Sequence, residues 1–422
     1  MRQRMILYRE SPRRWLAYLL IALLLALAPA VYADVRIEQA HGLVPQQPRG
    51  EWRFDADGIA FDNVSEGARL AGVLRLETGR YRVFVRPEVN PINPSPWYAF
   101  RILASRVGRV GMVFDYGTFE HRYHPWLRWH APGSRDDAWR IATEEEFSVG
   151  PDGHARLSLA MQEGDLVEVS AQPPIRLAEA QRWADSLAEG VAAPVETIGH
   201  SVLGRPLRLV AFGNPQARQA VLVIGRQHPP EVTGMRAQMA FVDALAEDTP
   251  RARAFRERYR ILVVPQLNPD GVVEGHWRTN AHGTDLNRDW GLFREPETQA
   301  VGQALRRHLD ESGRKLAFAL DFHSTWYDIF YTVTEDPARQ PGGVLRGWMN
   351  ALEARFPGRI EERPSAATSN VFKNWVFREY GAPSVTYEVG DETDVATLSE
   401  LAGFAAASLM DLLNGDGAED GP

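Results

Sequence analysis

The chain has 422 residues, carries a formal net charge of −8 and contains no cysteine. The lack of cysteine excludes disulfides, thiolate catalysis and cysteine-ligated zinc, and the acidic balance disfavours a nucleic-acid partner. Because the length exceeds what a single hydrophobic core usually needs, we expect two domains.

The first 33 residues have the pattern of an export signal. Several arginines precede an unbroken apolar run from Trp15 to Ala28, and small residues then allow cleavage before Asp34. The run is shorter than the roughly 20 residues that a membrane-spanning helix needs. We therefore expect a signal peptide at 1–33 and a periplasmic or secreted protein without stable membrane insertion. An uncleaved N-terminal anchor is the alternative.

Short segments of alternating apolar and polar residues, separated by turn residues, occupy residues 34–172. This pattern predicts an antiparallel β-sandwich. We expect the sandwich to have a structural role or to gate the substrate at the mouth of a catalytic cleft. The predicted strands are 73–76, 81–85, 97–102, 157–159 and 166–169.

The pattern changes after Pro173 and Pro174, where helical stretches begin to alternate with short apolar strands. Such alternation predicts an α/β domain over 175–414, with a mixed, largely parallel sheet and helices on both faces. Residues 415–422 are rich in glycine and acidic residues and are expected to form a disordered tail. The predicted helices lie near 177–189, 234–247, 296–312, 343–355 and 394–413, and the predicted strands are 207–212, 221–225, 261–265, 316–322, 329–333 and 384–388.

Two histidines and a glutamate follow apolar strands of this α/β domain. His228 and Glu231 come after strand 221–225, and His323 comes at the end of strand 316–322. Two histidines and one carboxylate make the ligand set of a catalytic zinc with one open position. Taken singly, the His-Glu pair could belong to a surface loop, and His323 could be a core histidine bonded to Asp321.

Further polar residues of the α/β domain suit peptide chemistry. Glu388 ends a predicted buried strand, where an unpaired carboxylate is rare. Beside a metal-bound water it could act as a general base, or else it is a salt-bridged structural residue. Arg278 and Arg288 lie in a loop-rich stretch with Asn287, and arginine is suited to bidentate capture of a carboxylate.

These motifs, in this order, resemble the zinc metallocarboxypeptidase family over about residues 176–414. The upstream segments 93–101 and 123–127 are similar to the β-sandwich that precedes the catalytic domain in cytosolic carboxypeptidases and their bacterial relatives. The matching elements are His228-x-x-Glu231, Asn268-Pro269-Asp270-Gly271, Arg278, Asp285-Leu286-Asn287-Arg288, His323 and Glu388.

The resemblance implies a zinc metallocarboxypeptidase that hydrolyses the C-terminal residue of peptides or proteins, possible substrates including cell-wall peptides. One Zn²⁺ per chain would be held by His228, Glu231 and His323. Glu388 would be the general base that activates the zinc-bound water and later protonates the leaving amine. The remaining roles are polarisation of the scissile carbonyl by Arg278 and binding of the terminal carboxylate by Asn287 and Arg288.

The chain departs from digestive carboxypeptidases in one respect, since no tyrosine occurs between Thr332 and Glu379, where those enzymes carry a mobile one. Lys373 lies where family members line the pocket for the terminal side chain. It could pair with an acidic side chain, or it could be a solvated helix residue.

Two other functions remain open. One is a zinc deacylase of the aspartoacylase group, acting on N-acyl amino acids, and the other is a non-catalytic binding module. The position of the sandwich before the catalytic domain favours the peptidase.

Overall fold

The computed structural model describes residues 42–130, 138–340 and 342–415. The predicted signal peptide at 1–33 lies outside these ranges, and so does the predicted tail beyond Gly415.

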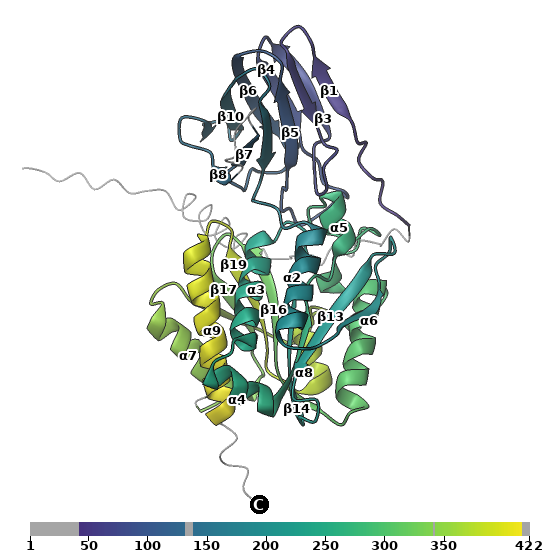
Figure 1. Cartoon of the computed structure of the whole chain (residues 1–422), viewed down its shortest axis with the longest axis vertical. Helices are drawn as coiled ribbons and strands as arrows, with labels where there is room; N and C mark the ends of the chain where they lie inside the picture. Colours follow the sequence, from purple (N-terminus) through teal and green to yellow (C-terminus); the bar gives the residue numbers. More distant parts are fainter. Residues whose placement is uncertain (1–41, 131–137, 341, 416–422) are drawn as a thin grey trace, which may run out of the picture. The chain divides into compact units, whose positions relative to one another are not determined.

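Two sheets form the N-terminal part of the described chain (Figure 1). Neighbouring strands are antiparallel in both sheets, except that β4 and β6 pair in parallel. The six-stranded sheet has the order β1 (Glu51–Phe54), β2 (Ile59–Asp62), β5 (Ala99–Ala104), β11 (Leu166–Ser170), β7 (Trp126–His130) and β8 (Trp139–Ile141). The five-stranded sheet has the order β3 (Gly72–Glu77), β4 (Arg80–Phe84), β6 (Gly108–Asp115), β10 (Ala155–Met161) and β9 (Phe147–Val149).

The sandwich core follows from the two-residue period of its strands. In β10, Leu157, Leu159 and Met161 are buried, while the residues between them face away from the core. The strands predicted at 73–76, 81–85, 97–102, 157–159 and 166–169 correspond to β3, β4, β5, β10 and β11, although β5 begins two residues later than predicted.

An eight-stranded mixed sheet forms the rest of the described chain. β14, β15, β16 and β19 pair in parallel, as do β17 and β18, whereas the other pairs are antiparallel. The predicted mixed, largely parallel sheet is therefore confirmed. The strand order is β12 (Val195–His200), β13 (Pro206–Gly213), β15 (Tyr259–Val264), β14 (Gln219–Gly225), β16 (Lys315–Thr325), β19 (Ser384–Gly390), β17 (Ile329–Val333) and β18 (Glu361–Ser365).

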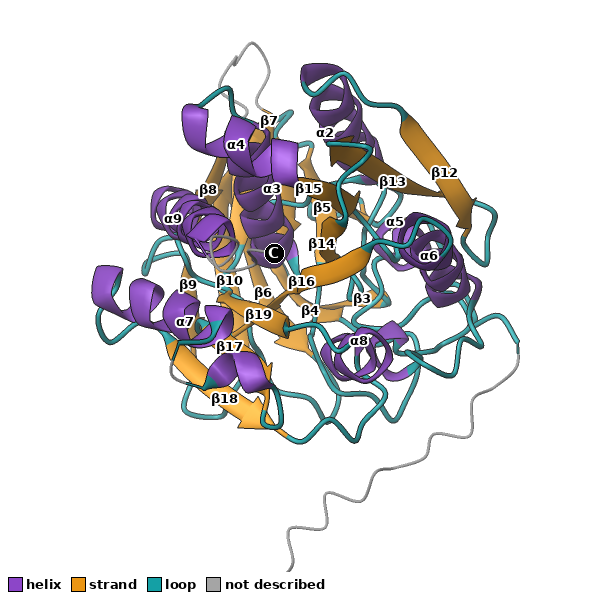
Figure 2. Cartoon of the chain, turned by 90° about the horizontal axis from the view of Figure 1, so that it is seen from below, coloured by secondary structure: helices purple, strands orange, loops and turns teal. Residues whose placement is uncertain are grey.

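Helices cover both faces of this sheet, as predicted (Figure 2). One face carries α2 (Leu177–Gly190), α3 (Val232–Ala246), α4 (Pro250–Arg258), α7 (Val344–Arg355) and α9 (Val395–Gly415). The other carries α6 (Pro296–Leu305), which continues as the π-helical turn Arg306–Asp310, and α8 (Phe372–Tyr380). The short helices are α5 (Pro269–Glu274) and the 3₁₀ turns Leu286–Arg288 and Pro337–Arg339.

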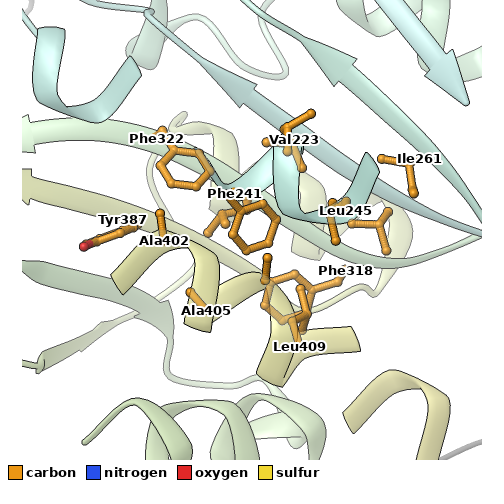
Figure 3. Packing of buried hydrophobic residues seen from close by; sticks show 14 of the residues in the cluster. Val223, Phe241, Leu245, Ile261, Phe318, Phe322, Tyr387, Ala402, Ala405 and Leu409 are labelled. Carbon is orange, nitrogen blue, oxygen red and sulfur yellow. The ribbon is translucent and has the colours of Figure 1, made fainter. Parts of the chain in front are cut away.

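Alternate side chains of the central strands fill the two hydrophobic layers. Val221 and Val223 of β14 pack with Phe241 of α3, as Figure 3 shows for Val223 and Phe241, whereas Leu222 and Ile224 belong to the opposite layer. α9 is long and apolar enough to cross a membrane by composition. Its buried residues nevertheless belong to the same core as α3 and α7, which is the position of a core helix.

The change from sandwich to α/β architecture falls between Ser170 and Leu177. The described residues of the sandwich and of the α/β part belong to one compact unit, and the two parts are joined by contacts such as those of Trp277 with Glu88 and Trp97.

Candidate active site

Three neighbouring parallel strands end at the candidate site. β14 leads into the loop that carries His228 and Glu231, β16 carries His323, and β19 carries Glu388. Glu231 is the residue that precedes the first turn of α3. Since the carboxyl ends of adjacent parallel strands meet at one edge of a sheet, residues far apart in the sequence converge here.

His228, Glu231 and His323 are buried and can each direct one ligand atom toward a shared point. Nδ1 of His228 lies 2.8 Å from Glu231 Oε1, Nδ1 of His323 lies 2.8 Å from Glu231 Oε2, and the two Nδ1 atoms are 3.1 Å apart. Around a tetrahedral zinc with bonds of about 2.0–2.1 Å, ligand atoms lie about 3.3 Å apart. A small outward movement would therefore admit the ion, and three ligands leave its fourth position open.

A second carboxylate lies behind each histidine. Asp285 Oδ1 is 2.9 Å from Nε2 of His228, and Asp321 Oδ2 is 2.8 Å from Nε2 of His323. Carboxylates in this position fix the ring orientation of a metal-ligating histidine and increase its basicity. Gln227 also donates to Asp321 Oδ2 at 2.7 Å, which holds the second pair in place.

The charges of the site stabilise one another. Burial alone would raise the pKa of Glu231, but His228 and His323 outweigh it and hold that pKa well below its usual range. Burial likewise would lower the pKa of His323, but Asp321 and Glu231 raise it well above its usual value. Such a preformed set of negative and imidazole groups suits a divalent cation.

Glu388 is the direct neighbour of His323 across the parallel strands β16 and β19. Burial raises the pKa of its carboxyl to about 7, against the opposing effect of His323. A carboxyl group with a pKa near neutrality can both take up and release a proton at physiological pH.

Arg278 and Asn287 lie beside the set of His228, Glu231 and His323, which we call the metal-binding group. Arg278 Nε donates to Asp285 Oδ2 at 2.7 Å, and Glu231 and Glu388 are near enough to raise the pKa of its guanidinium although burial lowers it. Asn287 Nδ2 lies 3.3 Å from His323 Nε2, and its side-chain oxygen Oδ1 accepts from the Phe372 backbone N–H at 2.9 Å.

Arg288 and Lys373 lie outside the metal-binding group. The side chain of Arg288 is 51% exposed and donates to the Asn287 carbonyl oxygen at 2.8 Å. Lys373 follows Phe372 in α8 and is only 4% exposed, so of the two alternatives the solvated helix residue is wrong. Its ammonium turns inward to the backbone oxygen of Thr332 because α8 packs against the sheet on that side.

The family model for zinc carboxypeptidases matches residues 181–404, which is more than half of the chain. The chain belongs to the zinc carboxypeptidase family. The predicted family and the choice of zinc as the metal are thereby confirmed.

Relatives within the family lie in animals and bacteria. Cytosolic carboxypeptidase 6 of Mus musculus is 25% identical over 288 residues, covering 63% of this chain and 53% of the mouse protein. An uncharacterized protein of Zymomonas mobilis is 27% identical over 308 residues, covering 63% of this chain and 79% of that protein. The chain thus spans about half the length of the mouse relative it matches.

A solved metallo-carboxypeptidase from Burkholderia cenocepacia has the same fold. It superposes with a TM-score of 0.69 at 21% identity and covers 85% of this chain and 99% of the other. The superposition covers 85% of this chain, whereas the family model matches only residues 181–404, so the shared fold extends into the sandwich.

Sequence reasoning missed the role of Asp285, which it treated only as part of a motif. The residue lies 57 positions from His228, and no local pattern links the two. Asp321, by contrast, was named from the sequence as a bonding partner of His323, two residues away in the same strand, and the structure shows this contact.

Proposed function

We propose that this protein is a zinc metallocarboxypeptidase that releases the C-terminal residue of peptides. The observation that carries the proposal is the group of three ligands, His228, Glu231 and His323, with the protonatable Glu388 beside it. A deacylase or a binding module would share the ligands, but a pure binding module has no need of a proton-transfer group.

Each residue has a part in the proposed reaction. A zinc ion held by the three ligands would supply Lewis-acid polarisation of water and of the scissile carbonyl. The Glu388 carboxylate takes a proton from the attacking water and gives it to the leaving amine. Arg278 donates hydrogen bonds to the oxygen on which negative charge develops. Asn287 and Arg288 hold the terminal carboxylate and so select the last peptide bond.

The test combines metal analysis with peptide hydrolysis. We expect one zinc per chain in the purified protein, and release of the last residue from peptides with free but not amidated C-termini. Glu388→Gln should retain zinc and lower kcat by about 10²–10⁴-fold. Glu379→Gln, which makes the same change on the exposed face of α8, is the matched control and should leave kcat unchanged. Hydrolysis of N-acetyl amino acids in place of peptides would favour the deacylase.

We propose further that Lys373 gives a preference for an acidic terminal side chain. Its Nζ donates to the Thr332 carbonyl oxygen at 3.2 Å, to Ser365 Oγ at 2.9 Å and to Asn374 Oδ1 at 2.8 Å, all of which are neutral atoms. Burial lowers the pKa of Lys373 to about 8, and Glu335 opposes this at longer range. A buried ammonium whose bonding partners are neutral is suited to an anionic ligand.

Substitution of Lys373 tests this preference. Lys373→Met should lower kcat/KM for peptides ending in glutamate by about 10–100-fold relative to peptides ending in leucine. Lys315→Met removes an exposed lysine at the far end of β16 and should leave the ratio unchanged. The same ranking of terminal residues in wild type and Lys373→Met would exclude the assignment.

The location of the protein remains a proposal drawn from residues 1–33. An export signal would place the enzyme in the periplasm or outside the cell, where the peptides of the cell wall are accessible substrates. Fractionation of cells that express the full chain, with detection of the N-terminus of the mature protein, distinguishes a cleaved signal from an anchor.

A further inference from the structure

Glu88 lies in the sandwich, in the loop between β4 and β5, but its carboxylate binds the segment that carries Arg278. Oε2 accepts from the Trp277 backbone N–H at 2.7 Å. Oε1 accepts from the backbone N–H groups of Arg278 at 3.0 Å and Thr279 at 2.8 Å, and from Thr279 Oγ1 at 2.9 Å. One side chain of the sandwich therefore satisfies three consecutive backbone donors of the active-site loop.

The carboxylate of Glu88 is buried and ionised. The residue is 8% exposed, and burial would raise the pKa of its carboxyl. His276, Arg69 and the backbone donors outweigh this effect and keep the pKa below its usual value. Hydrogen bonds from several donors to a buried anion are strong and directional, so they fix the backbone that supplies them.

Trp277, the residue before Arg278, is held by the sandwich as well. Its ring is fully buried in the hydrophobic core of the sandwich and packs edge-to-face on Phe119, with ring centroids 5.3 Å apart. Its Nε1 donates to the Trp97 carbonyl oxygen at 2.9 Å. The ring and the backbone of the segment are thus both anchored in the N-terminal part.

The guanidinium of Arg278 points the other way, toward the metal-binding group, where Asp285 accepts its Nε–H at 2.7 Å. The position of Arg278 is therefore set by two carboxylates, Glu88 at its backbone and Asp285 at its side chain. Of these, only Glu88 comes from the sandwich.

We propose that Glu88 is a positioning residue for Arg278, so that the sandwich completes the transition-state binding site of the enzyme. The inference rests on the role proposed above for Arg278. This role of the sandwich differs from the structural or gating role expected from the sequence, because one sandwich side chain would affect the chemical step.

Glu88→Gln in the full-length zinc-loaded protein tests the proposal. The amide group brings N–H donors to face the backbone N–H groups, so the loop should shift. Since removal of one oxyanion donor lowers kcat by about 10²–10³-fold, we expect a loss of at least about tenfold in kcat, with KM and zinc content nearly unchanged. Asp57→Asn is the matched control: its carboxylate is also buried in the sandwich, but it accepts from Arg75 and Tyr81.

A double-mutant cycle separates positioning from general stability. In an Arg278→Ala background, Glu88→Gln should lower kcat/KM by less than about twofold, because the group it positions is gone. Asp57→Asn should leave kcat unchanged at temperatures where the variant is folded. An equal loss from Glu88→Gln with and without Arg278 would overturn the proposal.

Amide hydrogen exchange over residues 276–280 gives a readout that does not depend on activity. Exchange there should accelerate in Glu88→Gln and stay at the wild-type rate in Asp57→Asn. If the wild-type protein hydrolysed no peptide, the proposed function would fail, and exchange alone would decide this inference. Unchanged protection at 277–279 in Glu88→Gln would then refute it.

Discussion

Oδ1 of Asp285 lies 2.9 Å from Nε2 of His228, and Oδ2 of the same carboxylate accepts a hydrogen bond from Nε of Arg278. Burial would raise the pKa of Asp285, but Arg278 and His228 hold it well below its usual range. A single carboxylate therefore joins a metal ligand to the residue proposed to stabilise the oxyanion. Substitution of Asp285 should therefore affect both metal binding and catalysis.

Asp285→Asn should weaken zinc binding by about 10–100-fold, the usual effect of losing an orienting carboxylate. It should also lower kcat/KM at saturating zinc, because Arg278 loses its partner. Titration against a chelator of known affinity measures the first effect, and kinetics in excess zinc measure the second. Restoration of full kcat/KM by zinc alone would show that Asp285 acts on the metal only.

Gly234 allows α3 to approach β16 closely. Its backbone N–H donates to Ser324 Oγ at 2.7 Å, and a Cβ at this position would meet the carbonyl oxygen of His323. Gly234→Ala should therefore destabilise the protein by about 1–3 kcal/mol through overpacking and lower its affinity for zinc.

Gly403→Ala is the matched control for this substitution. Gly403 also lies in a helix, α9, but a Cβ there meets no atom within 4 Å. The change should stabilise the protein by about 0.5–1 kcal/mol, since alanine loses less conformational entropy than glycine. Chemical denaturation of both variants measures the contrast, and equal effects would contradict the packing argument.

Glu297 makes stability depend on pH. Burial raises the pKa of its carboxyl to about 7 in the folded protein, from an ordinary value of 4.5. The folded state therefore holds a proton that the unfolded state has lost between these values, and stability falls as pH rises from about 4.5 to about 7. Above pH 7 the free energy of unfolding should be lower by on the order of 1–3 kcal/mol than below pH 4.5.

Glu297→Gln should remove this dependence. The glutamine can still accept from Val202 N or Asn280 Nδ2, the present partners of the carboxylate. Thermal unfolding of both proteins at pH 5 and pH 8 tests the prediction. The Tm of the variant relative to that of wild type should be higher at pH 8 than at pH 5. The same difference in Tm at both pH values would argue against the prediction.

Zinc should stabilise the folded protein, because the three ligands come together only in the folded state. At a free concentration about 1,000 times the dissociation constant the gain is about 4 kcal/mol. We expect a chelator to lower the Tm of wild type and to leave that of His323→Ala nearly unchanged. An equal shift in both proteins would place the ion elsewhere.

The sequence predicted the central strands of the α/β sheet because each is an uninterrupted apolar run, such as Val221–Gly225. The edge strands β12 and β18 were missed, since they are short and largely polar, and β18 contains Pro364. β6 of the sandwich was also missed, although Val110, Met112 and Phe114 alternate as buried residues. Its glycines and arginine obscured the pattern.

The ligands of the site were predictable because each follows a strand and matches a motif of the resemblance. Glu88 was not, because nothing near it in the sequence marks it as part of a site 190 residues downstream. The inward turn of Lys373 was also unpredictable, since it depends on how α8 packs on the sheet.

The ring of Trp277 fills a space inside the sandwich, although it belongs to a loop of the α/β part. A gene cut at residue 173 would leave the first fragment with a cavity the size of an indole ring and the second with an exposed tryptophan. We therefore expect neither fragment to be a complete folding unit. We also expect an exchange of sandwiches between family members to succeed only if the loop around Trp277 is transferred with them.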